Sequence, residues 1–253
     1  MSLITGLLAG FFGGLLGIGG GVVMIPMMVG ILKTSQRQAH GTSLAALVFI
    51  GLAGSISYGL KGSIDLPASI LLASTATITA YAGARYSNSL PEWKLKRFFG
   101  FFLIFVAATL ILKPYITETV FVLSGTAKVL VLLLVGLITG VLAGIMGVGG
   151  GSVMIPAAVI FLGFDQHTAQ GSSLLTMVPM GIMGAWTHYR LGNVKMNILG
   201  SLIAGVFAGA YLGSSTAHLL DEALLRFIFG IVLLWTGIRS IRKSQPVNTE
   251  VNT

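Results

Sequence analysis

Long apolar stretches alternate with short polar segments along the whole chain. A bilayer crossing needs about 20 apolar residues, and most of these stretches are long enough to be read as transmembrane helices. The predicted helices span residues 42–60, 66–84, 98–112, 172–189, 196–217 and 224–241. The pattern therefore predicts an all-α polytopic membrane protein.

Two further apolar stretches, residues 2–32 and 127–163, are interrupted by glycine runs. As straight helices they would be about 45 to 55 Å long at ~1.5 Å per residue, against a hydrocarbon core of ~30 Å. We expect each to break at its glycines, with second legs at about residues 22–32 and 152–163. Pro26 and Pro156 would fit the first turns of these legs, where a missing N–H costs little. The pattern leaves open re-entrant hairpins or two full crossings.

The glycine runs belong to an internal repeat. The segment from Gly17 to Pro26 recurs 130 residues later, and twelve of twenty-one positions are identical between residues 6–26 and 136–156. Matches at the same offset continue through each half, which indicates a duplication. We divide the chain into a first transmembrane repeat at 1–125, a second at 126–243 and a polar C-terminal tail at 244–253.

The basic residues indicate how the two repeats are oriented. If each glycine-broken stretch returns to the side it came from, the fifteen Lys and Arg residues divide eleven to four; if each crosses, they divide seven to eight. Lys and Arg gather on cytoplasmic loops. We therefore expect two inverted repeats, each a glycine-broken helical element plus three transmembrane helices, with both termini cytoplasmic.

Composition narrows the function further. The chain is 55% hydrophobic and 9% charged, too few charges to cover a soluble globule. The net charge of +8 is typical of cytoplasmic loops and requires no nucleic-acid partner. The absence of cysteine excludes disulfides and thiolate metal sites, and we expect no metal and no cofactor. The start of the chain has no basic region typical of a secretory signal peptide.

The glycine corners are the first candidate site. In transporters built from inverted repeats, broken elements meet near the membrane midplane, and free N–H groups at helix starts favour an anion. The alternative is that the glycines only allow helices to touch. The candidate substrate-binding residues of the corners are Gly19, Gly20, Gly21, Val22, Gly149, Gly150, Gly151 and Ser152.

A repeated polar cluster follows each corner, at residues 38–43 and 168–173. Its candidate substrate-binding residues are His40, Thr42, Ser43, Gln170, Ser172 and Ser173. The four hydroxyl residues are also good N-caps for the predicted helices. His40 aligns with Gln170, which favours hydrogen bonding over metal ligation, although His40 is the first candidate if protons are coupled. Other polar residues deeper in the helices are expected to bond the backbone one turn back. They are Ser57, Tyr58, Ser74, Thr75, Thr77, Thr187 and His188.

The distribution of acidic residues argues against cation transport. The carboxylates are all in loops or at segment ends: Asp65, Glu92, Glu118, Asp165, Asp221, Glu222 and Glu250. A cation pump normally places an acid inside the membrane, so an anion held by neutral donors fits better. An intramembrane serine protease would use Ser152 and His188, but Val22 stands at the position equivalent to Ser152. We therefore expect no enzyme.

The paired G-x-G-G-G-x-x-x-x-P motifs, each followed by a polar G-[TS]-S before a helix, resemble those of the sulfite exporter TauE/SafE family. The resemblance covers essentially the whole chain. It implies transport of sulfur-containing anions such as sulfite, sulfoacetate and other organosulfonates across the cell membrane, the inner membrane in a Gram-negative cell. It also implies that the glycine motifs and the starts at 41–43 and 171–173 surround the substrate.

The sequence thus predicts a secondary transporter that exports a small sulfur-containing anion by alternating access. Its partners would be the anionic substrate and the lipid bilayer, and self-association into a homo-oligomer is left open. An uncoupled anion channel is the alternative, and a membrane subunit that binds a partner protein is a third reading.

Overall fold

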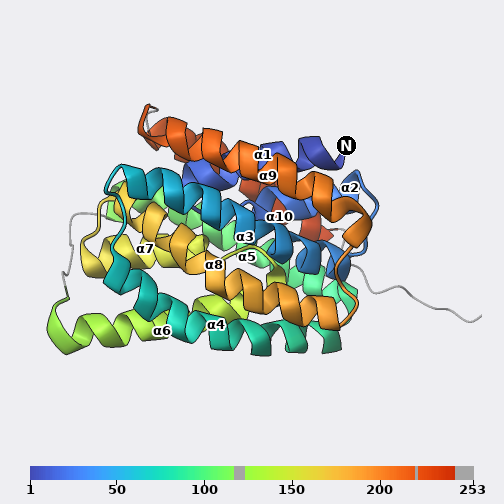
Figure 1. The fold of residues 1–253 in the computed structure, drawn as a ribbon, viewed down its shortest axis with the longest axis horizontal. Helices are drawn as coiled ribbons and strands as arrows, with labels where there is room; N and C mark the ends of the chain where they lie inside the picture. Colours follow the sequence, from blue (N-terminus) through green and yellow to red (C-terminus); the bar gives the residue numbers. More distant parts are fainter. Residues whose placement is uncertain (117–122, 220–221, 243–253) are drawn as a thin grey trace, which may run out of the picture.

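The computed structural model describes residues 1–116, 123–219 and 222–242, which form α-helices and one short 3-10 helix without any strand (Figure 1). The all-α prediction is confirmed for this part of the chain. The elements are α1 (Ser2–Leu16), α2 (Gly21–Gly30), α3 (Gln36–Leu60), α4 (Leu66–Ser89), α5 (Glu92–Ile116), α6 (Gly125–Met146), α7 (Gly151–Leu162), α8 (Gln166–Arg190), α9 (Met196–Thr216), η1 (Ala217–Leu219) and α10 (Glu222–Arg242).

The helix boundaries follow the 130-residue offset of the sequence. Helices α3 and α8 begin and end at equivalent positions, α1 and α6 end at equivalent positions, and α2 and α7 begin at equivalent positions. The same local sequence therefore forms the same local structure in both halves.

The helices pack mainly in one row. Helix α1 lies along α9, α9 packs on α3, α3 on α8, α8 on α4 and α4 on α6, while α5 and α10 form a separate pair (Figure 1). Helices α3 and α8 contribute fully buried residues such as Leu44, Leu47 and Met177 to the core. The glycine motifs of both halves lie against this central pair.

Glycine stripes allow the outer helices to approach closely. A Cβ atom added to any glycine of these stripes would collide with backbone atoms of the facing helix, so we conclude that small residues are required there. In the pair α1 and α9 the stripe contains Gly6, Gly10, Gly14, Gly205, Gly209 and Gly213, and in α6 against α4 it contains Gly136, Gly140 and Gly144.

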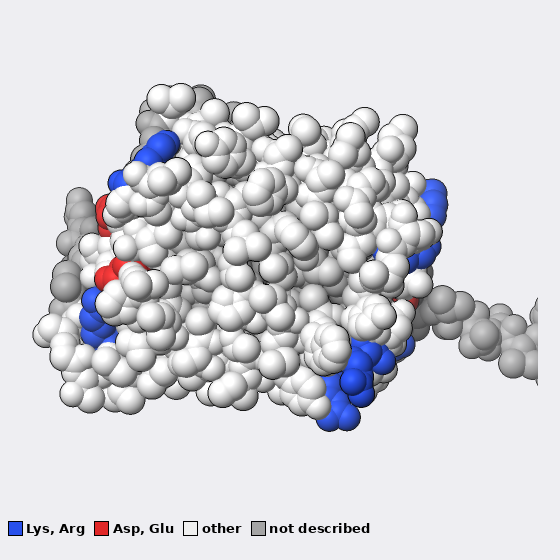
Figure 2. Space-filling model, in the orientation of Figure 1, with Lys and Arg blue, Asp and Glu red and all other residues white. Residues whose placement is uncertain are grey.

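The surface is that of a multi-pass membrane protein. Helices α3, α4, α6 and α9 are long and apolar enough to cross a bilayer by length and composition. Figure 2 shows the charged residues gathered at the two ends of the molecule, with a wide uncharged band between them on the face drawn. A bilayer accepts such a band because helices satisfy their own backbone polar groups.

Two predictions about α3 and α8 are wrong: the residues at which these helices begin and the residues that cap them. These helices begin before residues 42 and 172, and their N-caps are Ser35, in a capping box with Gln38, and Asp165, which accepts from the Thr168 N–H. Partial burial would raise the pKa of the Asp165 carboxyl, but hydrogen bonds from Thr168 and His167, together with the charge of His167, outweigh it and lower that pKa. The predicted caps Thr42, Ser43, Ser172 and Ser173 instead lie inside the helices and are buried, because the other half of the chain packs over them.

The prolines of the glycine motifs also lie deeper than predicted. Helices α2 and α7 begin at Gly21 and Gly151, so Pro26 and Pro156 are inside the helices rather than in their first turns. The reason is that each helix begins directly at the last glycine of its run, whereas a proline in the first turn would need a helix that begins later. With 10 and 12 residues at ~1.5 Å per residue, neither leg alone crosses the ~30 Å core.

Several sequence predictions fall on parts of the chain outside the described residues. These are the polar tail at 244–253 and the loop positions of Glu118, Asp221 and Glu250. Within the described residues, Asp65 and Asp165 are at helix starts as predicted.

Candidate functional site

The two glycine corners contact each other in the interior. Each corner turns through glycines with left-handed backbone at equivalent positions, Gly17 and Gly19 in the first half and Gly147 and Gly149 in the second. A Cβ atom on Gly21 would collide with the Gly147 carbonyl and Val148, and one on Gly151 with the Gly17 carbonyl and Ile18. Only glycine permits this approach, so the corners form one central junction.

All residues that the sequence proposes for the site are buried. The structure brings four residues of the polar clusters to the junction: the His40 backbone and the Ser43 hydroxyl lie against Gly147, and the side chains of Gln170 and Ser173 lie against Gly17. The hydroxyls of Thr42 and Ser172 are used elsewhere. They accept hydrogen bonds from the N–H groups of Lys195 and Asp65, each at 2.9 Å, in the loops before α9 and α4.

Each repeat supports the corner of the other. The Ser43 hydroxyl donates to the Gly147 carbonyl at 2.5 Å, and the equivalent Ser173 donates to the Gly17 carbonyl at 2.8 Å. Both hydroxyls also lie 2.9 Å from the carbonyl three residues earlier in their own helices. Ser43 and Ser173 therefore hold the two corners through equivalent hydrogen bonds.

His40 is fixed by two partners. Its Nδ1 lies 2.9 Å from the Ile145 carbonyl, and its Nε2 lies 2.8 Å from the Gln36 amide nitrogen. Because a carbonyl can only accept, Nδ1 carries the hydrogen and Nε2 accepts from Gln36. His40 thus satisfies a carbonyl at the end of α6, where helices leave acceptors unpaired.

Two supporting residues were assigned the wrong partner by sequence reasoning. The Tyr58 hydroxyl donates to Gln170 Oε1 at 2.9 Å, and His188 Nε2 lies 3.0 Å from the Gly144 carbonyl, so both contact other helices. Both reach the junction because α3 and α8 pack against α1 and α6 there. The sequence did contain a signal for this role, since these two polar residues occupy equivalent positions of the repeat, 130 residues apart. Thr187 and Ser74 bond the backbone about one turn back, as predicted.

The second corner offers unused donors. The hydroxyls of Ser152 and Thr139 are buried, 2% and 1% exposed, and have no hydrogen-bond partner among the described residues. No hydrogen bond between described residues uses the N–H of Gly151 or Ser152. A Cβ atom on Gly150 would meet the Thr139 methyl group, which places Thr139 against this corner. The equivalent positions in the first repeat are Val22 and Ala9, so the junction is asymmetric.

Thr139 is a residue that the sequence analysis did not select. A threonine inside an apolar helix where the other repeat has alanine was the available signal.

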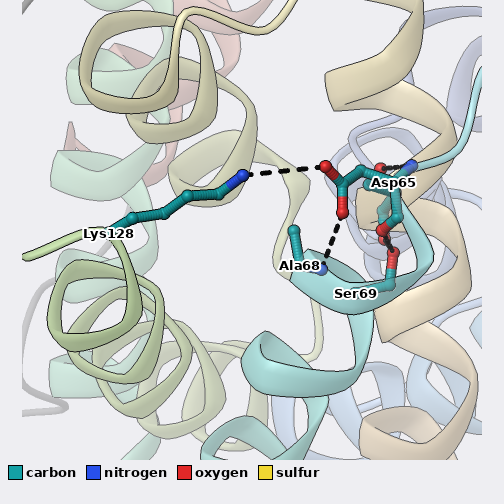
Figure 3. Close-up of polar contacts among 5 residues, drawn as sticks. Asp65, Ala68, Ser69 and Lys128 are labelled. Carbon is teal, nitrogen blue, oxygen red and sulfur yellow. Dashed lines mark hydrogen bonds and ion pairs between the residues drawn. The ribbon is translucent and has the colours of Figure 1, made fainter. Parts of the chain in front are cut away.

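An ion pair lies at the start of α4, away from the junction. Asp65 Oδ2 is 3.8 Å from Lys128 Nζ, and Asp65 Oδ1 accepts from the Ala68 N–H at 2.8 Å (Figure 3). The Ser69 hydroxyl also donates to the Asp65 carbonyl at 2.7 Å. Asp65 therefore caps α4 and links it to α6, which is a structural role.

The serine-protease alternative would require Ser152 to pair with His188. Ser152 and His188 do not bond each other in the part of the chain described, since Ser152 Oγ has no partner and His188 Nε2 bonds Gly144. Within the same residues, no cluster of three or more His, Asp or Glu could hold a metal ion.

Comparison with known proteins gives the family. The profile described as "Sulfite exporter TauE/SafE" matches residues 2–240. The chain belongs to the sulfite exporter TauE/SafE family. No solved structure matches this family member significantly.

Relatives of this TauE/SafE protein are found in bacteria and archaea. It is 26% identical over 266 residues to "Probable membrane transporter protein YunE" of Bacillus subtilis (strain 168), covering 94% of this chain and 96% of the relative. It is 30% identical over 255 residues to "Probable membrane transporter protein MJ0441" of Methanocaldococcus jannaschii, covering 93% and 92%. A "Probable membrane transporter protein" of Xylella fastidiosa (strain 9a5c) is 27% identical over 247 residues, covering 95% and 94%. This TauE/SafE protein is therefore a membrane transporter and not an enzyme.

Proposed function

We propose that this protein is a secondary transporter that exports small sulfur-containing anions, sulfite or an organosulfonate such as sulfoacetate, by alternating access. The observation that carries the proposal is the buried contact of the two glycine corners. Beside it, the N–H groups at the start of α7 and the hydroxyls of Ser152 and Thr139 have no hydrogen-bond partner among the described residues. The family description supports the substrate class.

Neutral donors would hold the anion at the second corner. The N-terminus of α7 carries the positive end of the helix dipole, worth roughly 1 kcal/mol, and larger when water is excluded. Sulfite or sulfonate oxygens would accept from the N–H groups of Gly151 and Ser152 and from the hydroxyls of Ser152 and Thr139. Several modest donors acting together predict affinity in roughly the micromolar to millimolar range.

The four hydroxyls of the polar clusters are occupied in this conformation. Ser43, Thr42, Ser172 and Ser173 already bond the backbone. In our proposal, they would contact the anion in another state of the transport cycle, when the two repeats move relative to each other.

We further infer inverted repeats with cytoplasmic termini, in the cell membrane or the inner membrane of a Gram-negative cell. In the inverted arrangement, Lys33, Lys96 and Arg239 lie on the same side of the membrane, whereas parallel repeats would place Arg239 opposite the other two. All three line one cavity, which supports the inverted arrangement. Parallel repeats would also place Arg85 and Arg190 on opposite sides of the membrane. These two residues line one cavity as well.

The decisive variants are Ser152→Ala and Thr139→Val, assayed in proteoliposomes with sulfite, sulfate, thiosulfate, taurine and sulfoacetate. Neither hydroxyl has a partner to lose among the described residues, so both variants should fold, while transport should fall about tenfold for each lost donor of ~1.4 kcal/mol. Ser74→Ala, which removes an exposed hydroxyl bonded within its own helix, is the matched control. Unchanged transport by the double variant would contradict the site.

A separate exchange assay distinguishes a carrier from a channel. Exchange stimulated by substrate on the far side indicates a carrier, and its absence indicates an uncoupled channel.

A further inference from the structure

A cavity of about 340 Å³ lies between α2, α5 and α10 at the end of the bundle where α2 finishes. Its walls include the apolar side chains of Ile25, Phe99 and Trp235. Its polar lining includes the cationic side chains of Lys33, Lys96 and Arg239 together with Gln36. It is separate from the glycine junction described above.

A second cavity, of about 380 Å³, continues along α2 toward the junction. The two cavities share lining residues from both helices, Pro26 and Gly30 of α2 and Trp235 and Arg239 of α10. The second also reaches Val22, the residue after Gly21 at the first corner. Together they follow α2 from the cationic end of the bundle as far as the buried Val22.

The three cations around the cavity are not neutralised by described carboxylates. The ion pair found among the described residues is Lys128 with Asp65, and no hydrogen bond of Lys33, Lys96 or Arg239 to a described acidic group is present. The Arg239 guanidinium lies over the Trp235 ring at 5.2 Å. Like charges gathered in a cleft with apolar walls raise the local concentration of an ion of opposite sign.

Gln36 links the cavity to the junction. Its side chain is buried, lines the cavity and donates to His40, which in turn donates to the Ile145 carbonyl near the second corner. A buried amide on the wall can also donate to an oxygen of a ligand, because its nitrogen carries two hydrogens.

We propose that this cavity is an oxyanion-binding vestibule, lined by Lys33, Lys96, Arg239 and Gln36, from which substrate reaches the glycine junction along α2. Its ligand is a compact oxyanion with a sulfate, sulfonate or phosphate type of group. The link to transport rests on the proposed function, whereas binding in the vestibule does not. The phosphate of an anionic lipid has the same chemistry as a free oxyanion, so the experiment separates the two sources.

Trp235 provides a reporter on the wall of the vestibule, with 61% of the residue exposed. The full-length protein carrying Trp93→Phe and Trp186→Phe retains only Trp235 and is placed in nanodiscs of phosphatidylcholine. Titration with sodium sulfate should give a saturable change in fluorescence that sodium chloride at equal ionic strength does not give. Lys33→Gln and Lys96→Gln should each weaken the apparent affinity at least fivefold. Arg85→Gln, which removes a cation from a different cavity, is the matched control and should leave the affinity unchanged.

Nanodiscs with phosphatidylglycerol form the second arm. A Trp235 response to this lipid that competes with sulfate and is lost in Lys33→Gln supports the oxyanion site with a lipid phosphate as its occupant. A response to sulfate alone supports a free oxyanion. The proposal is overturned if neither probe changes the emission, or if the response survives the combined Lys33→Gln and Lys96→Gln substitutions. Transport without any Trp235 response refutes the vestibule alone, and a Trp235 response without transport refutes the proposed function alone.

Discussion

The Ser173 hydroxyl lies 2.8 Å from the carbonyl oxygen of Gly17, and this bond joins α8 of the second repeat to the glycine corner of the first. Ser43 makes the equivalent bond to Gly147. Because each repeat donates a hydrogen bond to the corner of the other, neither corner is supported by its own repeat alone. Stability of the junction and contact between the repeats are therefore coupled.

Removing one of these bonds should destabilise the protein. We expect Ser173→Ala to lower the free energy of unfolding by about 1 kcal/mol, because the buried Gly17 carbonyl loses a donor and bonds within membranes are worth roughly this amount. Thermal unfolding in detergent measures the change. Ser152→Ala serves as the comparison, since its hydroxyl has no described partner and should leave the unfolding temperature unaltered. Equal unfolding temperatures for Ser173→Ala and the wild type would show that the cross-repeat bond does not stabilise the junction.

The glycine stripes predict which glycines tolerate a methyl group. In Gly140→Ala the new Cβ collides with Thr79 and with the Ala76 carbonyl of α4, so we expect α4 and α6 to separate at a cost of about 1 to 3 kcal/mol. In Gly200→Ala no atom lies within 4 Å of the new Cβ, and the helix should gain up to ~1 kcal/mol. The yield of monodisperse protein in gel filtration compares them. A Gly140→Ala protein that matches Gly200→Ala in yield would contradict the close packing.

His40 is expected to act as a structural hydrogen-bonding residue. Both ring nitrogens are bonded, to Ile145 and Gln36, and the equivalent position in the other repeat is Gln170. His40→Gln keeps a donor for the Ile145 carbonyl and should retain transport with an unchanged pH profile, whereas His40→Ala should reduce folded yield. Transport measured from pH 5 to 8 tests this. If His40→Gln flattened the profile, the histidine would be the carrier of a coupled proton.

The Asp65 carboxylate has two separable roles. Asp65→Asn removes the ion pair with Lys128 but keeps an oxygen for the Ala68 N–H, so the loss should stay below ~1 kcal/mol because the pair is partly exposed. Asp65→Ala also removes the cap and should cost about 1 kcal/mol more. Thermal unfolding ranks the two variants. The reverse order would indicate that the ion pair outweighs the cap.

Sequence patterns reached only part of the candidate site. The motif glycines could be selected because left-handed backbone and close approach are properties of glycine itself. The partners of Ser43 and Ser173 could not be assigned, since both hydroxyls bond carbonyls more than 100 residues away. The N-caps were misplaced for the same reason, because a polar cluster buried by the other repeat has the same local pattern as a helix start.

The sequence by itself determined the helical class, the break at each glycine motif and the 130-residue repeat, because the length of an apolar run and the freedom of glycine act over a few residues. Only the tertiary structure decided that the corners touch and that Tyr58 and His188 reach the junction. It also decided that the hydroxyls of Ser152 and Thr139 have no hydrogen-bond partner in the part of the chain described. It also decided the cavity that gathers Lys33, Lys96 and Arg239. Such contacts depend on how distant helices pack, and hydrophobic periodicity carries no information about which helix faces which.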